Sequence, residues 1–292
     1  MSTLSDTGNK GATHARGPWP FITLRSFVLH GQHIVLKSRE RRKGLIRFLQ
    51  HDDAPAWRQP AYNWWMGLIF ACGASLFMLG AALSLVHTSL ANWQIGLVFF
   101  LGSIPFTTAA FMQNLQAANA PEDAPPKASA APQPFRVIGW RPGNLGWLST
   151  ITQFVGTIAF NFNTLDAIHP LPGWYAQDLT IWLPGIVGSI LFMISGYLAF
   201  TEISHGYWSY SSRDIDWWIA FSNLLGCIFF LTAGVLAFVP RGPEPGWIAD
   251  VANIHLFLGA TGFLVGAVLM MRESRQVETI DNARKTASQA TT

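Results

Sequence analysis

The chain has 292 residues, of which 50% are apolar and only 12% are charged. Soluble domains carry about 25% charged residues, so this composition excludes a soluble enzyme with a solvated surface. The two cysteines are too few for a disulfide framework or a four-thiolate zinc site.

A basic segment precedes the first apolar run. Residues 1–20 are polar and predict a disordered N-terminus, and no signal peptide is recognisable before the first span. Within the small basic segment 21–61, apolar and β-branched residues on both sides of His30-Gly31 predict two strands. From Ser38 onward the pattern changes and predicts a basic, partly amphipathic helix.

The basic run from Arg39 to Arg47 has two interpretations. Clustered cations can bind nucleic acid, but beside a membrane the simpler expectation is contact with anionic lipid headgroups, at about 1 kcal/mol per cation. We therefore expect the lipid bilayer as a partner, with anionic lipid at this segment, and no nucleic acid. A homo-oligomer or a protein partner stays open.

Six stretches are long and apolar enough to cross a bilayer, which takes about 20 mostly apolar residues. None of them carries a Lys or Arg in its interior. The third is the most polar, because it contains Gln153, Asn161 and Asn163. The six stretches are residues 63–86, 93–112, 147–165, 180–203, 216–239 and 250–271.

These stretches divide the chain into segments. The first two form a helix hairpin, 62–112, and an Ala- and Pro-rich cytoplasmic linker, 113–146, follows it. The other four form the rest of the membrane domain, 147–272, and the polar tail 273–292 is expected to be disordered. The predicted fold is an all-α polytopic membrane protein. It has six transmembrane helices in three hairpins, preceded by a short β-hairpin and basic helix.

The distribution of basic residues predicts the orientation. With six spans, eighteen of the nineteen Lys and Arg residues fall on one side, and only Arg241 falls on the other. Cytoplasmic segments carry the excess of cations in membrane proteins. We therefore expect a multi-pass protein of the bacterial inner membrane with both termini in the cytoplasm.

Each predicted span contains the same short motif, which is a glycine, a small residue and two variable residues followed by phenylalanine. Phenylalanine fills 21 of 292 positions, so six occurrences at one offset argue against chance. Residues four apart share a helix face, so each helix presents a hole at Gly and a ring at Phe. The motif predicts a helix-packing seam, and a glycine-lined ligand pocket is the alternative. The pairs are Gly73 and Phe77, Gly102 and Phe106, Gly156 and Phe160, Gly188 and Phe192, Gly226 and Phe230, and Gly259 and Phe263.

The form of this repeat in Gly102-Ser-Ile-Pro-Phe106 and Gly188-Ser-Ile-Leu-Phe192 resembles the YrhK-like family of small bacterial membrane domains. That family is built from two-helix hairpins and has no characterised function. The resemblance covers residues 60–272 as three consecutive hairpins. Residues 156–164 and 217–226 also resemble stretches of longer bacterial membrane proteins that carry the domain. The resemblance implies a fold and a membrane location, and no reaction.

Polar residues within membrane spans are costly and mark candidate sites. The candidate polar site consists of Asn161, Asn163, Asp166, Asn223, Asn253 and His255. All but Asn223 are expected near the non-cytoplasmic side, where His87 and His169 also lie. Asn223 is expected toward the cytoplasm, where Glu202 and His205 end the fourth span. The alternative is that these groups satisfy one another at hydrated helix ends.

The motifs of known enzymes and cofactor sites do not occur in the chain. There is no Gly-x-Ser-x-Gly, no phosphate-binding loop and no His-Glu-x-x-His. His255 is the only histidine inside a span, whereas a haem would need histidines on facing helices. The spacing of the histidines and carboxylates does not favour a metal site, and Cys72 and Cys227 read as buried apolar thiols. We expect no catalytic residue, no metal and no cofactor.

Two functions are compatible with these features. The first is an integral membrane protein with a structural, sensory or partner-binding role, built around the glycine–phenylalanine repeat. The second is a small transporter or channel that uses the polar residues of the third, fifth and sixth spans, because internal repeats are common in transporters. An enzyme acting on a lipid is a further alternative, and a non-enzymatic role is favoured.

Overall fold

Six long helices form the body of the protein in the computed structural model. The structure describes residues 14–29, 32–45, 55–86, 88–121, 134–243 and 245–289. The long helices are α2 (Pro60–Leu85), α3 (Asn92–Ala118), α4 (Leu145–Asp166), α6 (Leu183–Ser204), α7 (Ile215–Leu236) and α8 (Gly246–Gln289).

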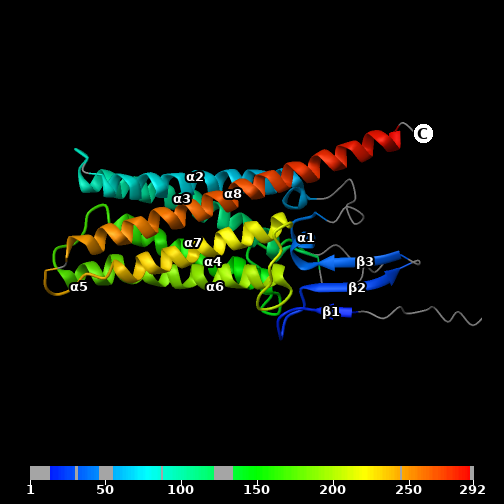
Figure 1. Ribbon diagram of the computed structural model, residues 1–292, viewed down its shortest axis with the longest axis horizontal. Helices are drawn as coiled ribbons and strands as arrows, with labels where there is room; N and C mark the ends of the chain where they lie inside the picture. Colours follow the sequence, from blue (N-terminus) through cyan, green and yellow to red (C-terminus); the bar gives the residue numbers. More distant parts are fainter. Residues whose placement is uncertain are drawn as a thin grey trace, which may run out of the picture.

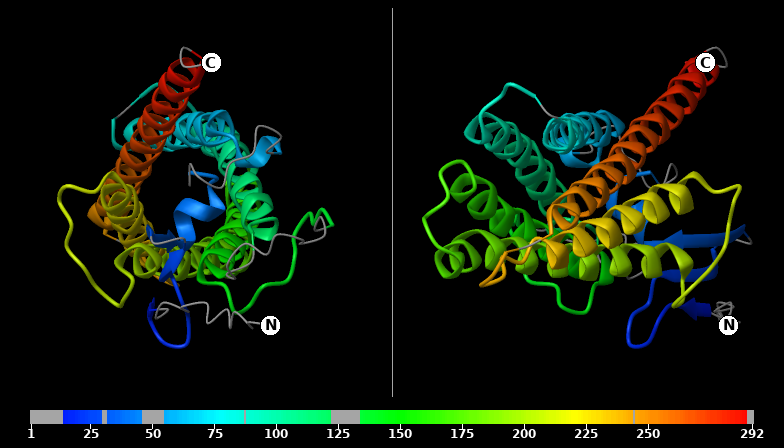
Figure 2. Two further views of the ribbon diagram at one scale, coloured as in Figure 1. Left: turned by 90° about the vertical axis from the view of Figure 1, so that its right-hand side faces the viewer. Right: turned by 60° about the vertical axis from the view of Figure 1, so that its left-hand side comes forward.

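These helices form a closed ring. Long helices that follow one another in the chain pack side by side, and α8 packs against α2, which closes the ring (Figure 2). The short helix α5 (Trp174–Gln177) lies at one end, which we call the loop end (Figure 1). The other end carries the N-terminal strands and the short helix α1 (Ser38–Arg42), and we call it the cap end.

Five of the long helical segments are apolar enough to cross a membrane, judged by length and composition. These segments are Pro60–Leu85, Asn92–Ala118, Trp174–Ser204, Ile215–Leu236 and Gly246–Ile280. The third predicted span corresponds to α4, which is not among the five because Gln153, Asn161 and Asn163 lower its mean hydropathy. Five of the six predicted spans are thus helices that are long and apolar enough to cross a membrane. The remaining span, at α4, stays a prediction.

The glycine–phenylalanine motifs meet in pairs within three helix hairpins. A methyl group added at Gly73 would lie 2.8 Å from the ring of Phe106, and one added at Gly102 would lie 3.0 Å from Phe77. Each glycine therefore leaves the space that the partner's ring occupies, and the two backbones approach closely. The same exchange pairs Gly156 with Phe192 and Gly188 with Phe160 in α4–α6, and Gly226 with Phe263 and Gly259 with Phe230 in α7–α8.

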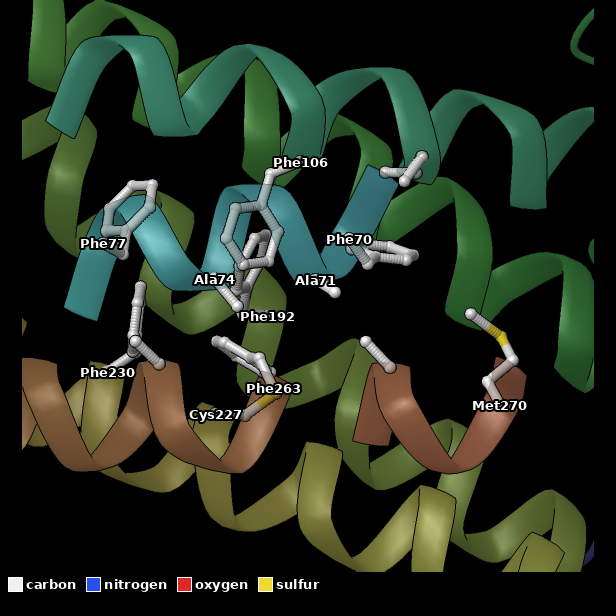
Figure 3. Close-up of a cluster of buried hydrophobic side chains, with 14 of the residues drawn as sticks. Phe70, Ala71, Ala74, Phe77, Phe106, Phe192, Cys227, Phe230, Phe263 and Met270 are labelled. Carbon is white, nitrogen blue, oxygen red and sulfur yellow. The ribbon is translucent and has the colours of Figure 1, made fainter. Parts of the chain in front are cut away.

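The six rings of these motifs meet at the centre of the bundle, and we call them the phenylalanine cluster. All six are buried, and rings from different hairpins have centroids 5.7 to 6.4 Å apart. Figure 3 shows Phe77, Phe106, Phe192, Phe230 and Phe263 pointing toward one another between the helices. The void beside them has a volume of about 10 Å³, room for about one water molecule. The cluster therefore closes the middle of the ring.

A small antiparallel sheet precedes the ring. The predicted hairpin is present as β2 (Leu24–Leu29) and β3 (Gln32–Lys37), with Phe27 paired to Ile34. A third strand, β1 (His14–Arg16), pairs with β2 in a region where the sequence predicts disorder. The predicted β-hairpin is therefore extended to a three-stranded sheet, in which edge pairing orders part of a polar N-terminus.

Helix α1 is shorter than predicted and lies inside the ring. It has five residues, directly follows β3, and the chain turns at Gly44 with a φ of +69°. Figure 2 shows α1 in the middle of the cap end, enclosed by the long helices. Residues 46–54, which include the rest of the predicted basic helix with Arg47, lie outside the described part of the chain.

Both ends of the predicted linker and most of the predicted tail differ from the expectation. Helix α3 continues to Ala118, past the predicted start of the linker at residue 113. Helix α8 continues to Gln289, although residues 273–292 are expected to be disordered, and it projects beyond the ring (Figure 1). Glu273 and Ser274 are buried, so packing at the cap end carries the helix past its apolar part.

Candidate functional site

Three buried ion pairs hold α1 in the cap end. The pairs are Arg39 with Asp216 of α7, Arg42 with Glu202 of α6, and Lys43 with Glu273 of α8. All six side chains are at most 12% exposed. We call α1 together with Lys43 the cap. Because the carboxylates come from three different helices, the cap contacts α6, α7 and α8 at once.

The Arg42–Glu202 pair has two close contacts. Nη1 of Arg42 donates a hydrogen bond to Oε1 of Glu202 at 3.0 Å, and Nη2 lies 3.0 Å from Oε2, which is buried and accepts no hydrogen bond. The hydroxyl of Ser38 donates to the same carboxylate at 2.8 Å. Gly146 lies directly beside the pair, and a methyl group there would collide with Arg42. The site therefore requires glycine at this position of α4.

Burial and neighbouring charges shift the pKa values of Arg39 and Lys43 in opposite directions. Burial disfavours the charged form of Arg39, but the carboxylates of Asp216, Glu273 and Glu202 outweigh it and raise its pKa. Burial and the neighbouring charge of Arg39 lower the pKa of Lys43, and Glu273 and Asp216 only partly offset this effect. Of the two cations, Lys43 is therefore the one that loses its proton more easily.

The segments on either side of α1 are fixed by hydrogen bonds. Asn63 of α2 donates to the carbonyl oxygen of Lys43 at 3.1 Å and accepts from Gln116 of α3 at 3.1 Å. On the side of the sheet, the hydroxyl of Thr23 and the imidazole Nδ1 of His205 form a hydrogen bond of 2.9 Å. The sheet and the cap are thus held on the ring together.

A cavity of about 70 Å³ lies between α1 and the phenylalanine cluster. Arg39, Arg42 and Lys43 line it from the cap, and Phe106 and Phe263 line it from the cluster. Its volume has room for roughly five water molecules at about 10–15 Å³ each. All six long helices contribute to the wall, so the cavity lies on the axis of the ring.

One wall of this cavity is polar. It consists of Gln113, Gln116, Ser149, Thr150, Gln153 and Asn223. The side-chain amides of Gln113 and Gln153 form no hydrogen bond within the described residues, and neither is among the fully enclosed atoms that lack a partner. Their polar atoms are therefore open to the cavity. The charged residues that line the described cavity are Arg39, Arg42 and Lys43, and each of them is already paired with a carboxylate.

The predicted polar site is not one cluster. Asn161 accepts a hydrogen bond from Thr107 of α3 at 3.1 Å, and Asn163 donates to the carbonyl oxygen of Ile181 at 2.8 Å. Asp166 is exposed at the end of α4. These residues lie toward the loop end, and separate contacts hold the two asparagines.

The other three predicted residues lie elsewhere. Asn253 donates to a carbonyl oxygen one turn earlier in α8, and His255 bonds to a carbonyl oxygen of the same helix in the same way. Asn223 lies toward the cap end and lines the cavity. His87 is outside the described residues. No group of three or more His, Cys, Asp or Glu side chains in the described chain could hold a metal ion.

The residues that form the cap site were only partly visible in the sequence. Glu202 and Asp216 were recognisable as acidic residues at span ends, and Glu273 follows the sixth span directly. Nothing in the order of residues pairs them with Arg42, Arg39 and Lys43, more than 150 positions away. Gln113 and Gln153 carried a weak signal, because each is an amide within or next to a span.

No protein-family model, no curated protein and no solved structure matches this chain. The resemblance to the YrhK-like membrane domains therefore stays a prediction from the repeat.

Proposed function

We propose that all six long helices cross the membrane. Helix α4 has 22 residues, which span about 33 Å at 1.5 Å per residue, enough for a hydrocarbon core of about 30 Å. Its exposed positions include Val155, Ile158, Phe162 and Leu165, whereas Thr150, Gln153, Thr157 and Thr164 are buried. The buried polar side chains of α4 therefore face the ring interior, and an apolar surface faces outward. Asn161 and Asn163 are half-buried and bond to Thr107 and Ile181.

We further propose that the cap end lies on the cytoplasmic side of a bacterial inner membrane. Six crossings place both termini on one side, and that side carries eighteen of the nineteen basic residues. A reporter active only in the cytoplasm should work at either terminus, and one active only outside should work when inserted at residues 88–91. Cytoplasmic activity from residues 88–91 would contradict this topology.

For the cavity, we propose that it binds a small anion and that the protein is a membrane-embedded sensor for that anion. The supporting observation is a cavity lined by three cations, by two amides without protein partners, and by no carboxylate among the described residues. Because each cation is already paired with a carboxylate, an anion would be held by shared cations together with the amide N–H donors, whose hydrogen bonds to an anion are strong in a site of low dielectric. The volume suits an ion of the size of chloride, nitrate or formate with some water.

A sensing role follows from where the cavity lies. An anion there would share Arg39, Arg42 and Lys43 with the carboxylates of α6, α7 and α8, so its binding would change the free energy that holds α1 in the ring. A ligand shifts a conformational equilibrium by its difference in affinity for the two states. Because α1 directly follows β3, the N-terminal sheet would transmit the change to the cytoplasm.

Transport across the membrane is the weaker candidate. It would need a path from the cavity to the loop end, and the phenylalanine cluster leaves only about 10 Å³ there. The polar residues of α4, α7 and α8 that such a path would use form separate contacts. The geometry therefore favours binding over conduction.

The test is a thermal-stability titration of the purified protein in detergent, with sodium chloride, nitrate or formate replacing sodium gluconate at constant ionic strength. A bound anion stabilises by RT ln(1 + [L]/Kd), about 2.7 kcal/mol at one hundred times Kd. We expect at least one of the three anions to raise the melting temperature with saturation.

The matched variants are Gln153→Leu, which removes a cavity amide, and Thr152→Val, one position away on the same helix. Thr152 donates to its own backbone at Leu148 and does not line the cavity. We expect Gln153→Leu to weaken the anion effect and Thr152→Val to keep it. An equal, unsaturated response in all three proteins would be a general salt effect and would refute the proposed site.

A further inference from the structure

A second site lies outside the ring, where α8 leaves it at the cap end. A groove of about 800 Å³ runs between the first turns of α2 and the part of α8 from Val268 to Ile280. It is open to the surroundings and is separate from the cavity under α1, with which it shares no lining residue. Both helices are among the five candidate membrane spans.

The groove changes character along its length. Leu68, Val268 and Met271 line the part nearer the middle of the bundle, and Arg272 and Arg275 line the part nearer the cap end. Both arginines are exposed, and the residues that line the described groove include no Asp or Glu. The apolar part of the groove thus leads to two cations that have no acidic neighbour in the groove.

The position of the groove matches a membrane interface. Trp64 lies near the cap-end start of α2, and the guanidinium carbon of Arg275 lies 5.3 Å from the centre of its ring. Tryptophan favours the headgroup level of a bilayer, so the two arginines lie where phosphates lie. Guanidinium groups bind phosphate oxygens with two hydrogen bonds.

We propose that this groove binds an anionic phospholipid, with its phosphate at Arg272 and Arg275 and one acyl chain along Leu68 and Val268. A lipid is the occupant favoured by the arrangement, because the apolar part faces outward within two membrane spans and the charged part lies at their interface end. The proposal differs from the sequence-based expectation of lipid contact at Arg39–Arg47. In that run, Arg39, Arg42 and Lys43 are buried in ion pairs and do not face lipid.

The site would also connect lipid to the cap. Arg272 is adjacent to Glu273, the partner of Lys43. Successive helical residues point in different directions, so Arg272 faces the groove while Glu273 faces α1. A lipid held by Arg272 therefore restrains the turn of α8 that also anchors the cap, whether or not the cavity binds an anion.

The experiment is native mass spectrometry of the full chain released from nanodiscs that contain equal amounts of phosphatidylglycerol and phosphatidylcholine. We expect the parent to retain phosphatidylglycerol several-fold more than phosphatidylcholine. The double variant Arg272→Gln/Arg275→Gln should lose this preference. The matched control Arg213→Gln/Arg241→Gln removes the same charge from two exposed arginines, one of which, Arg241, also lies over a tryptophan, and it should keep the preference.

A second variant tests the acyl part without changing charge. Val268→Trp places a ring in the groove and should lower retention of phosphatidylglycerol while the melting temperature in detergent is maintained. Equal retention of the two lipids by the parent would overturn the proposal, as would an equal loss in the control. A groove that instead joins two copies would show a loss of dimers in Val268→Trp with unchanged lipid retention, and that result would also overturn it.

Discussion

Replacing Glu202 by glutamine is expected to lower the free energy of unfolding by about 3–5 kcal/mol, the usual cost of removing one partner of a buried ion pair. The side chain of Glu202 is 0% exposed and that of Arg42 is 10% exposed, so the variant leaves a buried cation without its carboxylate. Glutamine keeps the size of the side chain, and the effect therefore reports charge. An SDS titration in mixed micelles measures it.

Two controls separate the pair from general damage. Asp166→Asn removes an acidic residue that is exposed at the loop end, and surface changes of this kind stay within about 0.5 kcal/mol. The double variant Arg42→Met/Glu202→Gln removes the unpaired cation as well and should recover much of the loss, because apolar replacement of a buried pair is often neutral. If Glu202→Gln alone is as stable as the parent, the pair does not hold the cap.

The parts of the fold that the sequence predicts are those set by local pattern. Long apolar helices are predictable because the bilayer requires about 20 apolar residues per helix. The apolar and β-branched residues on both sides of His30-Gly31 predict the hairpin. Helix α4 is the exception among the long helices. Its buried polar side chains, such as Gln153 and Thr157, face the ring interior, a direction that mean hydropathy does not register.

The cap was not predictable because it depends on contacts between distant segments. The sequence shows Arg39, Arg42 and Lys43 only as a run of cations, and such a run is usually solvated or bound to lipid. Their burial depends on carboxylates that α6, α7 and α8 bring to one end of the ring. The helix beyond residue 273 was missed for a related reason, since its polar composition carries no apolar period.

The candidate polar site shows the opposite error. Asn161, Asp166 and His255 have similar depths in their spans, and depth alone suggested that they meet. Helix faces decide contact, and in the structure Asn161 turns to α3 while His255 bonds within α8. The depth of a polar residue in its span therefore predicts neither which polar residues meet nor the cavity at the cap end.

Introducing leucine at Gly226 or at Gly188 is expected to destabilise the bundle by about 1–3 kcal/mol each, the usual cost of overpacking. A methyl group at Gly226 would already lie 2.7 Å from the ring of Phe263 and 3.0 Å from the carbonyl oxygen of Gly259. At Gly188 the nearest atoms are the ring of Phe160 at 2.9 Å and the carbonyl oxygen of Gly156 at 3.0 Å. The backbone atoms cannot move aside without separating the helices.

Separation of two membrane helices is not compensated elsewhere, because lipid is as apolar as the interface that is lost. Thermal unfolding in detergent should therefore show a clear fall in melting temperature for both leucine variants. Leu191→Ile, at a variable position of the motif next to Phe192, should leave the melting temperature nearly unchanged. Phe192→Ala should also lower the melting temperature, because emptying the hole at Gly156 costs about 3–5 kcal/mol in the free energy of unfolding for a buried ring. Parent-like stability of both leucine variants would mean that the rings do not depend on these holes. The glycines would then be better explained as the wall of a ligand pocket.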